Sequence, residues 1–249
     1  MTIFERLSQA IEREERAVLL TVIDGEPVGA HVLVLENGER YGHGVPDEIV
    51  AQAGELIRGH RNQIVEAGEV RVFAEVVAPP PRLLVYGAVD TAEALCAAAK
   101  LLGWHTIVAD ARPRFATRDR IPSADELIVA WPEEAFEQIG PDHATAFVVL
   151  THDEKFDVPA LQAALASEAF YIGALGSRTN QQRRRERLLE VGVAEDALDR
   201  ISGPCGLDLG AESQSETALS ILAEIVARRA GRDGGPLKTA RQRIHAVVE

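Results

Sequence analysis

The sequence predicts an α/β protein: a Rossmann-like, doubly wound parallel sheet with a smaller N-terminal α+β domain before it. One observation is a series of β-rich runs without polar alternation, as expected for strands covered by helices on both faces. These runs lie at 82–86, 105–110, 126–131, 145–150 and 170–175. The other is a break at Pro79, Pro80 and Pro81, where the pattern changes, because proline lacks an amide donor and forces extended backbone before it.

The N-terminal domain is expected to span residues 1–78. A helix is predicted over 3–16, with Ile3, Leu7 and Ile11 forming a core-facing stripe at four-residue spacing. Strands are predicted at 17–23, 29–36 and 68–78, a tight turn at Asn37-Gly38, and a helix at 48–60. The first part of this domain, from 17 to 38, is therefore expected to form a meander.

The C-terminal domain is expected to span residues 82–230, with a looser tail at 231–249. The first crossover helix is predicted at 91–103. Ser213 and Glu216 have capping-box spacing and predict the start of the last helix. Its apolar stripe is expected to comprise Leu219, Leu222, Ile225 and Val226.

Composition excludes several classes of function. The chain has 249 residues and 26 Lys and Arg against 39 Asp and Glu, so its net charge of −13 disfavours nucleic acid and membrane partners. Cys96 and Cys205 are too few for a zinc site or a disulfide framework, and no metal site is expected. The N-terminus resembles no targeting signal, and no apolar run approaches the roughly 20 residues that span a bilayer. We expect a cytoplasmic protein.

The turn after the strand at 82–86 occupies the place of a dinucleotide-binding loop. Gly87, Ala88 and Asp90 lie in it, and Asp110 follows Gly87 at about the spacing of a ribose-binding acid. Val89 stands where a second glycine would admit a pyrophosphate, so the fingerprint is incomplete. Asp90 is either a ligand contact or the N-cap of the helix.

Polar residues also follow the next strand of the expected crevice. His152 and Asp153 come directly after the strand at 145–150, where α/β ligands bind. A structural histidine and a capping aspartate are the alternatives. Asp208, in the glycine-rich segment before the last helix, is a further candidate polar ligand, whereas capping alone explains Glu216.

The segment GALGSR is the strongest local signal for a ligand. Gly173 and Gly176 allow backbone amides to point outward, Ser177 or Thr179 can cap the following helix, and Arg178 lies in the loop. We expect a phosphate or pterin phosphate there. The arginines from 183 to 187 are expected to form a solvated face paired with Glu186 and Glu190.

The two cysteines are expected to differ in exposure. Cys96 lies among apolar residues of a predicted helix and is expected to pack in the core. Cys205, between Pro204 and Gly206, is the only plausible exposed thiol.

Taken in order, these segments resemble the xanthine dehydrogenase accessory factor family, XdhC/CoxI. The resemblance covers about 82–229 and rests on THD, YIGALGSR and GLDLGA. The N-terminal region RYGHGVPDE lacks the family's Ser-Gly-Gly-Cys stretch. The resemblance implies a chaperone that binds the molybdenum cofactor (molybdopterin), assists its sulfuration with a cysteine desulfurase and delivers it to the apo-enzyme of a molybdenum hydroxylase. It also implies a homodimer and no catalytic residues.

Two other functions remain open at the level of sequence. Gly87 and Asp110 in a βαβ unit also fit an NAD(P)-dependent oxidoreductase. Val89 and Asp90 also fit an interaction module whose Rossmann crevice is vestigial. Ligand binding separates these alternatives: the chaperone binds the molybdenum cofactor, the oxidoreductase binds NAD(P), and the interaction module binds neither.

Overall fold

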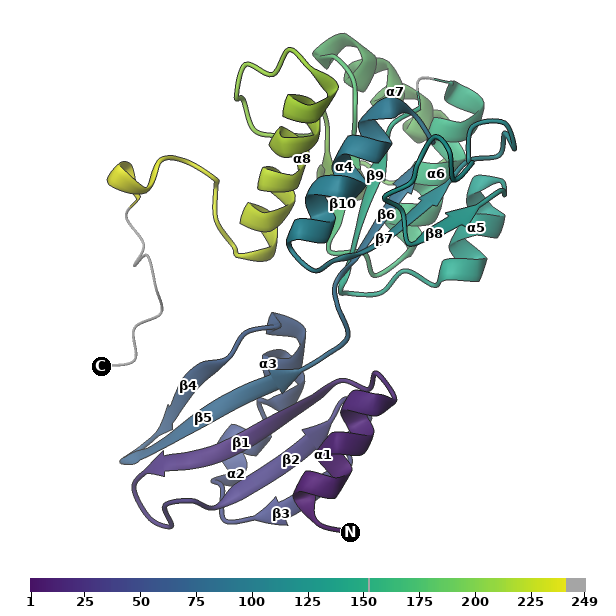
Figure 1. Cartoon of the computed structure of the whole chain (residues 1–249). Helices are drawn as coiled ribbons and strands as arrows, with labels where there is room; N and C mark the ends of the chain where they lie inside the picture. The colour runs from purple at the N-terminus through teal and green to yellow at the C-terminus, as the bar shows by residue number, and fades with distance from the viewer. Residues whose placement is uncertain (152, 241–249) are drawn as a thin grey trace. The chain divides into compact units, whose positions relative to one another are not determined.

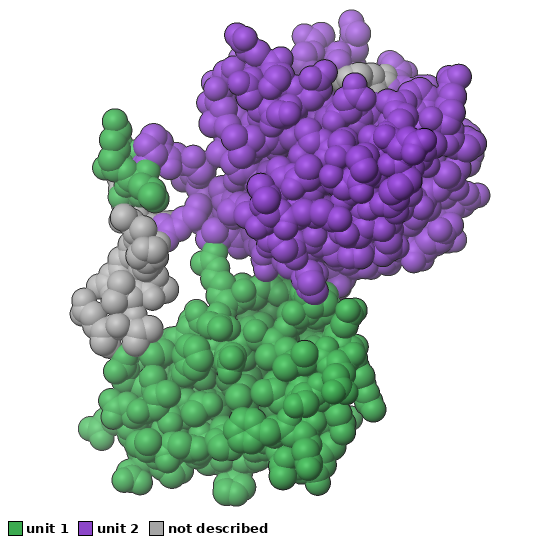
Figure 2. Space-filling model, viewed as in Figure 1, with its two compact units in different colours: residues 1–79, 237–249 green, residues 80–236 purple. Residues whose placement is uncertain are grey.

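The structure is a computed structural model that describes residues 1–151 and 153–240. Two compact units make up the chain (Figure 2): one comprises residues 1–79 with the segment that begins at Leu237, the other residues 80–236. Within the described ranges, no helix is both long and apolar enough to cross a membrane.

The first unit is built on a five-stranded antiparallel sheet in the order β3-β2-β1-β5-β4 (Figure 1). Its elements are α1 (Ile3–Glu12), β1 (Ala17–Asp24), β2 (His31–Leu35), β3 (Arg40–His43), α2 (Asp47–Val50), α3 (Ala53–Gly59), β4 (Gln63–Ala67) and β5 (Val70–Val77). Alternate residues of β1 face opposite sides of the sheet. Val18 and Leu20 pack with α2 and α3, whereas Ala17 and Leu19 pack with α1.

Several details of this unit differ from the sequence prediction. Helix α1 ends at Glu12, and Ile11 is 57% exposed, so the predicted stripe is wrong at its last residue. Ala10 is buried in its place, together with Arg6, whose guanidinium pairs with Glu15 at 2.5 Å. The helix predicted over 48–60 is two short helices, and strands β3 and β4 were not predicted.

The second unit has a six-stranded, all-parallel sheet in the order β11-β10-β9-β6-β7-β8, which confirms the predicted Rossmann-like fold. Its strands are β6 (Arg82–Tyr86), β7 (His105–Ala109), β8 (Glu126–Ile128), β9 (Thr145–Val149), β10 (Tyr171–Ala174) and β11 (Ile201–Ser202). Its helices are α4 (Asp90–Leu101), α5 (Pro132–Ile139), α6 (Glu154–Ala166), α7 (Arg178–Glu190), the 3-10 helix η1 (Ala197–Arg200) and α8 (Gln214–Arg229). A second 3-10 helix, η2 (Leu237–Thr239), follows this unit.

Helices cover both faces of this sheet, so its strands are buried on both sides. Leu83 and Val85 of β6 pack in one core with α4 and α8. Leu84 and Tyr86 pack in the other with α5 and α6. The capping box of α8 is present as predicted, with Ser213 accepting from the Glu216 amide.

The buried face of α8 differs from the predicted stripe. Leu222 and Ile225 are buried as expected, but Leu219 and Val226 are exposed. Ala218 and Ile221 occupy the core positions instead.

Candidate functional site

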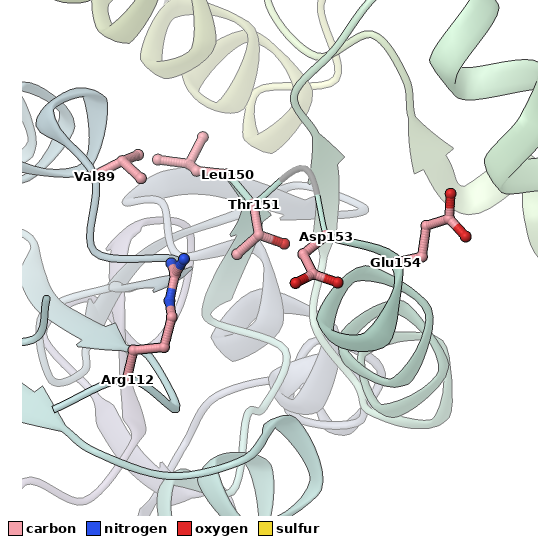
Figure 3. A pocket seen from close by; sticks show the side chains of 6 residues that line it. All are labelled: Val89, Arg112, Leu150, Thr151, Asp153 and Glu154. Carbon is pink, nitrogen blue, oxygen red and sulfur yellow. The ribbon is translucent and has the colours of Figure 1, made fainter.

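The order of the parallel strands places the candidate site. The strand order reverses between β6 and β9: the chain runs outward from β6 through β7 and β8 and then returns to form β9 on the other side of β6. Ligands of open α/β sheets bind beyond the carboxyl ends of the strands at such a point. A pocket of about 570 Å³ opens there (Figure 3). We call it the switch-point pocket; it is lined by Val89, Arg112, Leu150, Thr151, Asp153 and Glu154.

Gly87 lets the turn after β6 approach the turn after β9. Its φ is +110°, and a Cβ atom there would lie 2.7 Å from Cγ2 of Thr151. Ala88 is fully buried. Helix α4 begins at Asp90 and has Val89 as its N-cap, so the N-cap interpretation of Asp90 is wrong. The Asp90 carboxylate is exposed and pairs with Arg120 at 3.3 Å.

Asp110 is buried at the end of β7, with both carboxylate oxygens in use. Oδ1 accepts from the Arg112 amide at 2.9 Å and from Arg112 Nε at 2.8 Å. Oδ2 accepts from the Ala88 amide at 2.9 Å and from Arg112 Nη2 at 2.8 Å. Burial opposes ionisation, but these hydrogen bonds outweigh it and lower the pKa of Asp110. The sequence analysis took Asp110 as a candidate acceptor for a ribose hydroxyl. In the structure both of its oxygens already accept two hydrogen bonds from the protein.

Arg112 is a site residue that the sequence analysis missed. The hydrogen bond to Asp110 raises its pKa, and its guanidinium lies 4.1 Å from the centroid of the Phe115 ring. Nη1 has no acceptor in the part of the chain that the structure describes, and the side chain lines the switch-point pocket. Its position two residues after Asp110 was the available signal, because an arginine near that acid accommodates phosphate in some Rossmann proteins.

The segment after β9 contributes Thr151 and Asp153 to the pocket. Asp153 is the N-cap of α6 and accepts from the Lys155 amide at 3.2 Å, so the capping alternative is confirmed, and its carboxylate also borders the pocket. Glu154 pairs with Arg187. The predicted site residue His152 lies outside the described residues.

The GALGSR segment is divided between strand, turn and helix. Gly173 lies inside buried β10, where a Cβ atom would meet the Tyr171 ring at 2.7 Å. Gly176 has a φ of +146°, and Ser177 caps α7 by accepting from the Asn180 amide at 3.2 Å. For the amides of Gly176, Ser177 and Arg178, residues 1–151 and 153–240 provide no hydrogen-bond acceptor.

Arg178 does not line the switch-point pocket. It borders a second pocket of about 320 Å³, together with Gln181, Gly203 and Pro204. Asp208 is exposed in the loop before α8 and lines neither of these two pockets. The structure thus places Asp153 in the same pocket as Val89 of the turn after β6. Arg178 and Asp208 lie outside that pocket.

The buried side chain of Arg184 connects the turn after β10 with the segment after β9. It is buried and donates through Nη2 to Oδ2 of Asp157 at 2.7 Å and to the Leu175 carbonyl at 3.2 Å. Asp157 in turn accepts a hydrogen bond from Thr151 of the switch-point pocket. The predicted solvated arginine face is therefore wrong at Arg184, because α7 packs this residue against α6.

The remaining arginines of α7 do not pair with Glu186 and Glu190 as predicted. Arg185 pairs with Glu195 at 3.2 Å and with Asp199 at 3.4 Å. Arg187 pairs with Glu154 of α6.

Cys205 is buried, contrary to the sequence prediction of an exposed thiol. Its amide donates to the Ala174 carbonyl at 3.0 Å, and burial raises the pKa of its thiol to about 12. Cys96 is fully buried in the core, as predicted, and burial raises its pKa to about 12 as well. Neither thiol lines the switch-point pocket.

Known proteins share this architecture. The family model described as the XdhC Rossmann domain matches residues 83–225. A crystal structure described as a xanthine dehydrogenase from Bacillus halodurans superposes with a TM-score of 0.69 and 25% identity, covering 91% of this chain and 66% of that one.

Two relatives are similar to this chain over part of its length. The chain is 34% identical over 158 residues to a Bacillus subtilis protein named as a probable xanthine dehydrogenase subunit, covering 64% of this chain and 46% of the relative. It is 31% identical over 151 residues to the molybdenum cofactor insertion chaperone PaoD of Escherichia coli, covering 61% of this chain and 41% of the relative. The chain thus spans less than half the length of these relatives. Because the domain model matches more than half of the chain, and the resemblance seen in its motifs is thereby confirmed, this chain belongs to the XdhC family.

Proposed function

We propose that this chain is an accessory protein of molybdenum hydroxylases of the xanthine dehydrogenase type. It binds the molybdenum cofactor in the switch-point pocket, supports its sulfuration by a separate cysteine desulfurase and delivers it to the apo-enzyme. The observation that carries the proposal is a pocket at the reversal point of an XdhC Rossmann sheet with a guanidinium on its wall. The relative named a molybdenum cofactor insertion chaperone supports the delivery role.

The residues of the pocket fit a pterin that carries a phosphate. Val89 and Leu150 offer apolar surface for a flat ring, and Arg112 offers a guanidinium nitrogen to a polar atom of that ring. The first amides of α4 add donors at a helix N-terminus, where anions are stabilised. When bound, the cofactor supplies the redox chemistry of the client enzyme; the residues of this chain bind and orient it.

Sulfur transfer in this proposal depends on the desulfurase. Cys96 and Cys205 are both buried with raised pKa values, so neither presents a thiolate at neutral pH.

The domain that carries the pocket is residues 82–230, and residues 1–78 form a domain without chemistry of its own. A homodimer in the cytoplasm is part of the same proposal, and light scattering of the purified protein tests the oligomeric state.

The experiment is cofactor loading in a cofactor-producing host. The purified protein is expected to carry molybdenum, measured by mass spectrometry, and pterin phosphate, measured by fluorescence after oxidation. It is also expected to activate an apo molybdenum hydroxylase. Arg112→Ala is expected to reduce loading at least tenfold, whereas Arg114→Ala, an exposed arginine that does not line the pocket, leaves it unchanged.

Two outcomes contradict the proposal. One is binding of NAD(P) by calorimetry without any cofactor loading, which indicates an oxidoreductase. The other is the absence of binding of either ligand at millimolar concentration, which indicates an interaction module. Arg178→Ala tests the second pocket: if that variant alone loses cofactor, the phosphate binds there and the switch-point assignment is wrong.

A further inference from the structure

We infer that Arg112 and Asp153 make the switch-point pocket selective for a 2-amino-4-oxo heterocycle such as pterin: the guanidinium binds the ring carbonyl and the carboxylate binds the amino edge. The inference rests on the proposed function, because it names the chemistry by which the same pocket recognises its ligand. It extends that function from binding a phosphate-bearing cofactor to selecting one class of ring.

Arg112 supplies a fixed donor on one side of the pocket. Nε and Nη2 are both engaged by Asp110, and the guanidinium lies against Phe115, so the side chain has little rotational freedom. About two thirds of the side chain is buried. The remaining nitrogen, Nη1, therefore has a defined position and suits a ring carbonyl or an anion.

Asp153 supplies an acceptor on the other side. Figure 3 shows the Arg112 guanidinium and the Asp153 carboxylate on either side of Thr151. The negative charge of Asp153 contributes to the raised pKa of Arg112, yet the two groups make no direct hydrogen bond or ion pair. Asp153 is about half exposed, and its contacts with Lys155, at 3.2 Å to the amide and 3.4 Å to Nζ, leave acceptor capacity on both oxygens.

The second carboxylate of the pocket does not compete for this role. Glu154 points away from Arg112 in Figure 3 and pairs with Arg187 of α7. Among the described lining residues, Asp153 is thus the carboxylate that faces the guanidinium across the pocket.

The complementary ligand has two donors side by side and a carbonyl next to them. A 2-amino-4-oxo pyrimidine ring presents its N3–H and its 2-amino group to one carboxylate, and its O4 to a cation. Charge-assisted hydrogen bonds of this kind are stronger than neutral ones. Lumazine, which has an oxygen in place of the 2-amino group, places an acceptor against the carboxylate. A site built around a donor group rejects the analogue that lacks it.

The test compares binding of pterin and lumazine to the full chain by ligand fluorescence. Wild-type protein is expected to bind pterin at least tenfold more tightly than lumazine. Asp153→Asn is expected to reduce this preference to less than twofold while α6 stays intact, because asparagine is an equally good N-cap. Arg112→Gln is expected to weaken both ligands, and the matched control Glu168→Gln, at an exposed carboxylate that does not line the pocket, to change neither.

Each contrary outcome has a definite meaning. If wild-type protein binds both rings equally, or if Asp153→Asn keeps the tenfold preference, the inference is wrong. If the protein loads molybdenum cofactor and activates the client enzyme but shows no ring preference, the inference fails and the proposed function stands. If neither the cofactor nor pterin binds, both fail. Circular dichroism of each variant checks that the fold is retained.

Discussion

The guanidinium of Arg112 forms a bidentate ion pair with the carboxylate of Asp110: Nε donates to Oδ1 and Nη2 donates to Oδ2, both at 2.8 Å. Asp110 also accepts a hydrogen bond from the backbone amide of Ala88, so one buried carboxylate links the end of β7 to the turn after β6. In a dinucleotide fold an acid at this place binds ribose. Here the same acid positions an arginine at the edge of the pocket.

Replacing Asp110 by asparagine is expected to destabilise the protein. The substitution leaves Arg112 without its counter-charge and removes hydrogen bonds from a buried position, and breaking such a pair costs about 2–4 kcal/mol. Urea denaturation followed by circular dichroism measures the change. Asp90→Asn is the control: this exposed carboxylate is expected to contribute less than about 0.5 kcal/mol, and equal losses in the two variants contradict the prediction.

Arg184→Met is expected to cost about 3–5 kcal/mol, because it leaves Asp157 buried without its cation and removes a donor to the Leu175 carbonyl. Arg183→Met, one residue earlier and exposed, is expected to change the free energy of unfolding by less than about 0.5 kcal/mol. Denaturant titration of both variants makes the comparison. A stable Arg184→Met protein would show that the buried pair is dispensable.

Gly87→Ala is expected to cost about 2–4 kcal/mol, because a methyl group at a φ of +110° is strained and meets Thr151 at 2.7 Å. Gly103→Ala separates the two causes: its φ is +71°, but a Cβ atom there meets nothing within 4 Å. We expect a cost of about 1 kcal/mol for it. Thermal unfolding of the two variants checks the difference, and equal costs would mean that the close approach to Thr151 is unimportant.

Asp125 is expected to make the stability of the protein pH-dependent at acid pH. Burial opposes its ionisation, but the amide of Thr106 and the ammonium of Lys100 outweigh it and lower the pKa to about 2. A lowered folded-state pKa stabilises the protein above pH 4, and this contribution is lost as the pH falls from about 4 to about 2. At pH 7 we expect the free energy of unfolding of the wild type to exceed that of Asp125→Asn by about 1–2 kcal/mol, after allowance for the partial exposure of Asp125. Below pH 4 this difference between the two proteins is expected to narrow. A gap that stays constant with pH disproves this assignment.

The buried thiol of Cys205 is expected to resist modification in the folded protein. With a pKa of about 12, almost none of it is thiolate at pH 8. Ellman's reagent is expected to react with neither cysteine in native buffer and with both in guanidinium chloride. Rapid native labelling that disappears in Cys205→Ser would contradict the burial of this residue.

The sequence by itself determined the class of fold and the family. Unalternating apolar runs such as 82–86 and 145–150 identify strands buried on both faces, because a strand with one solvated face carries polar residues at every second position. The Ser213 and Glu216 spacing identified the start of α8, since a capping box is a contact within one helical turn. Such features depend on residues close together in the chain.

Only the tertiary structure decided which polar groups face a ligand and which are used internally. Arg184 and Asp157 are 27 residues apart in the sequence, and nothing local distinguishes Arg184 from the arginines beside it. Likewise, the packing of Tyr171 and Glu224 around the Cys205 loop buries a thiol that glycine and proline neighbours suggested was exposed. The physical reason is that pairing and burial depend on which helices and strands meet. Periodicity predicts that a helix exists, but packing against its neighbours sets the rotation of that helix.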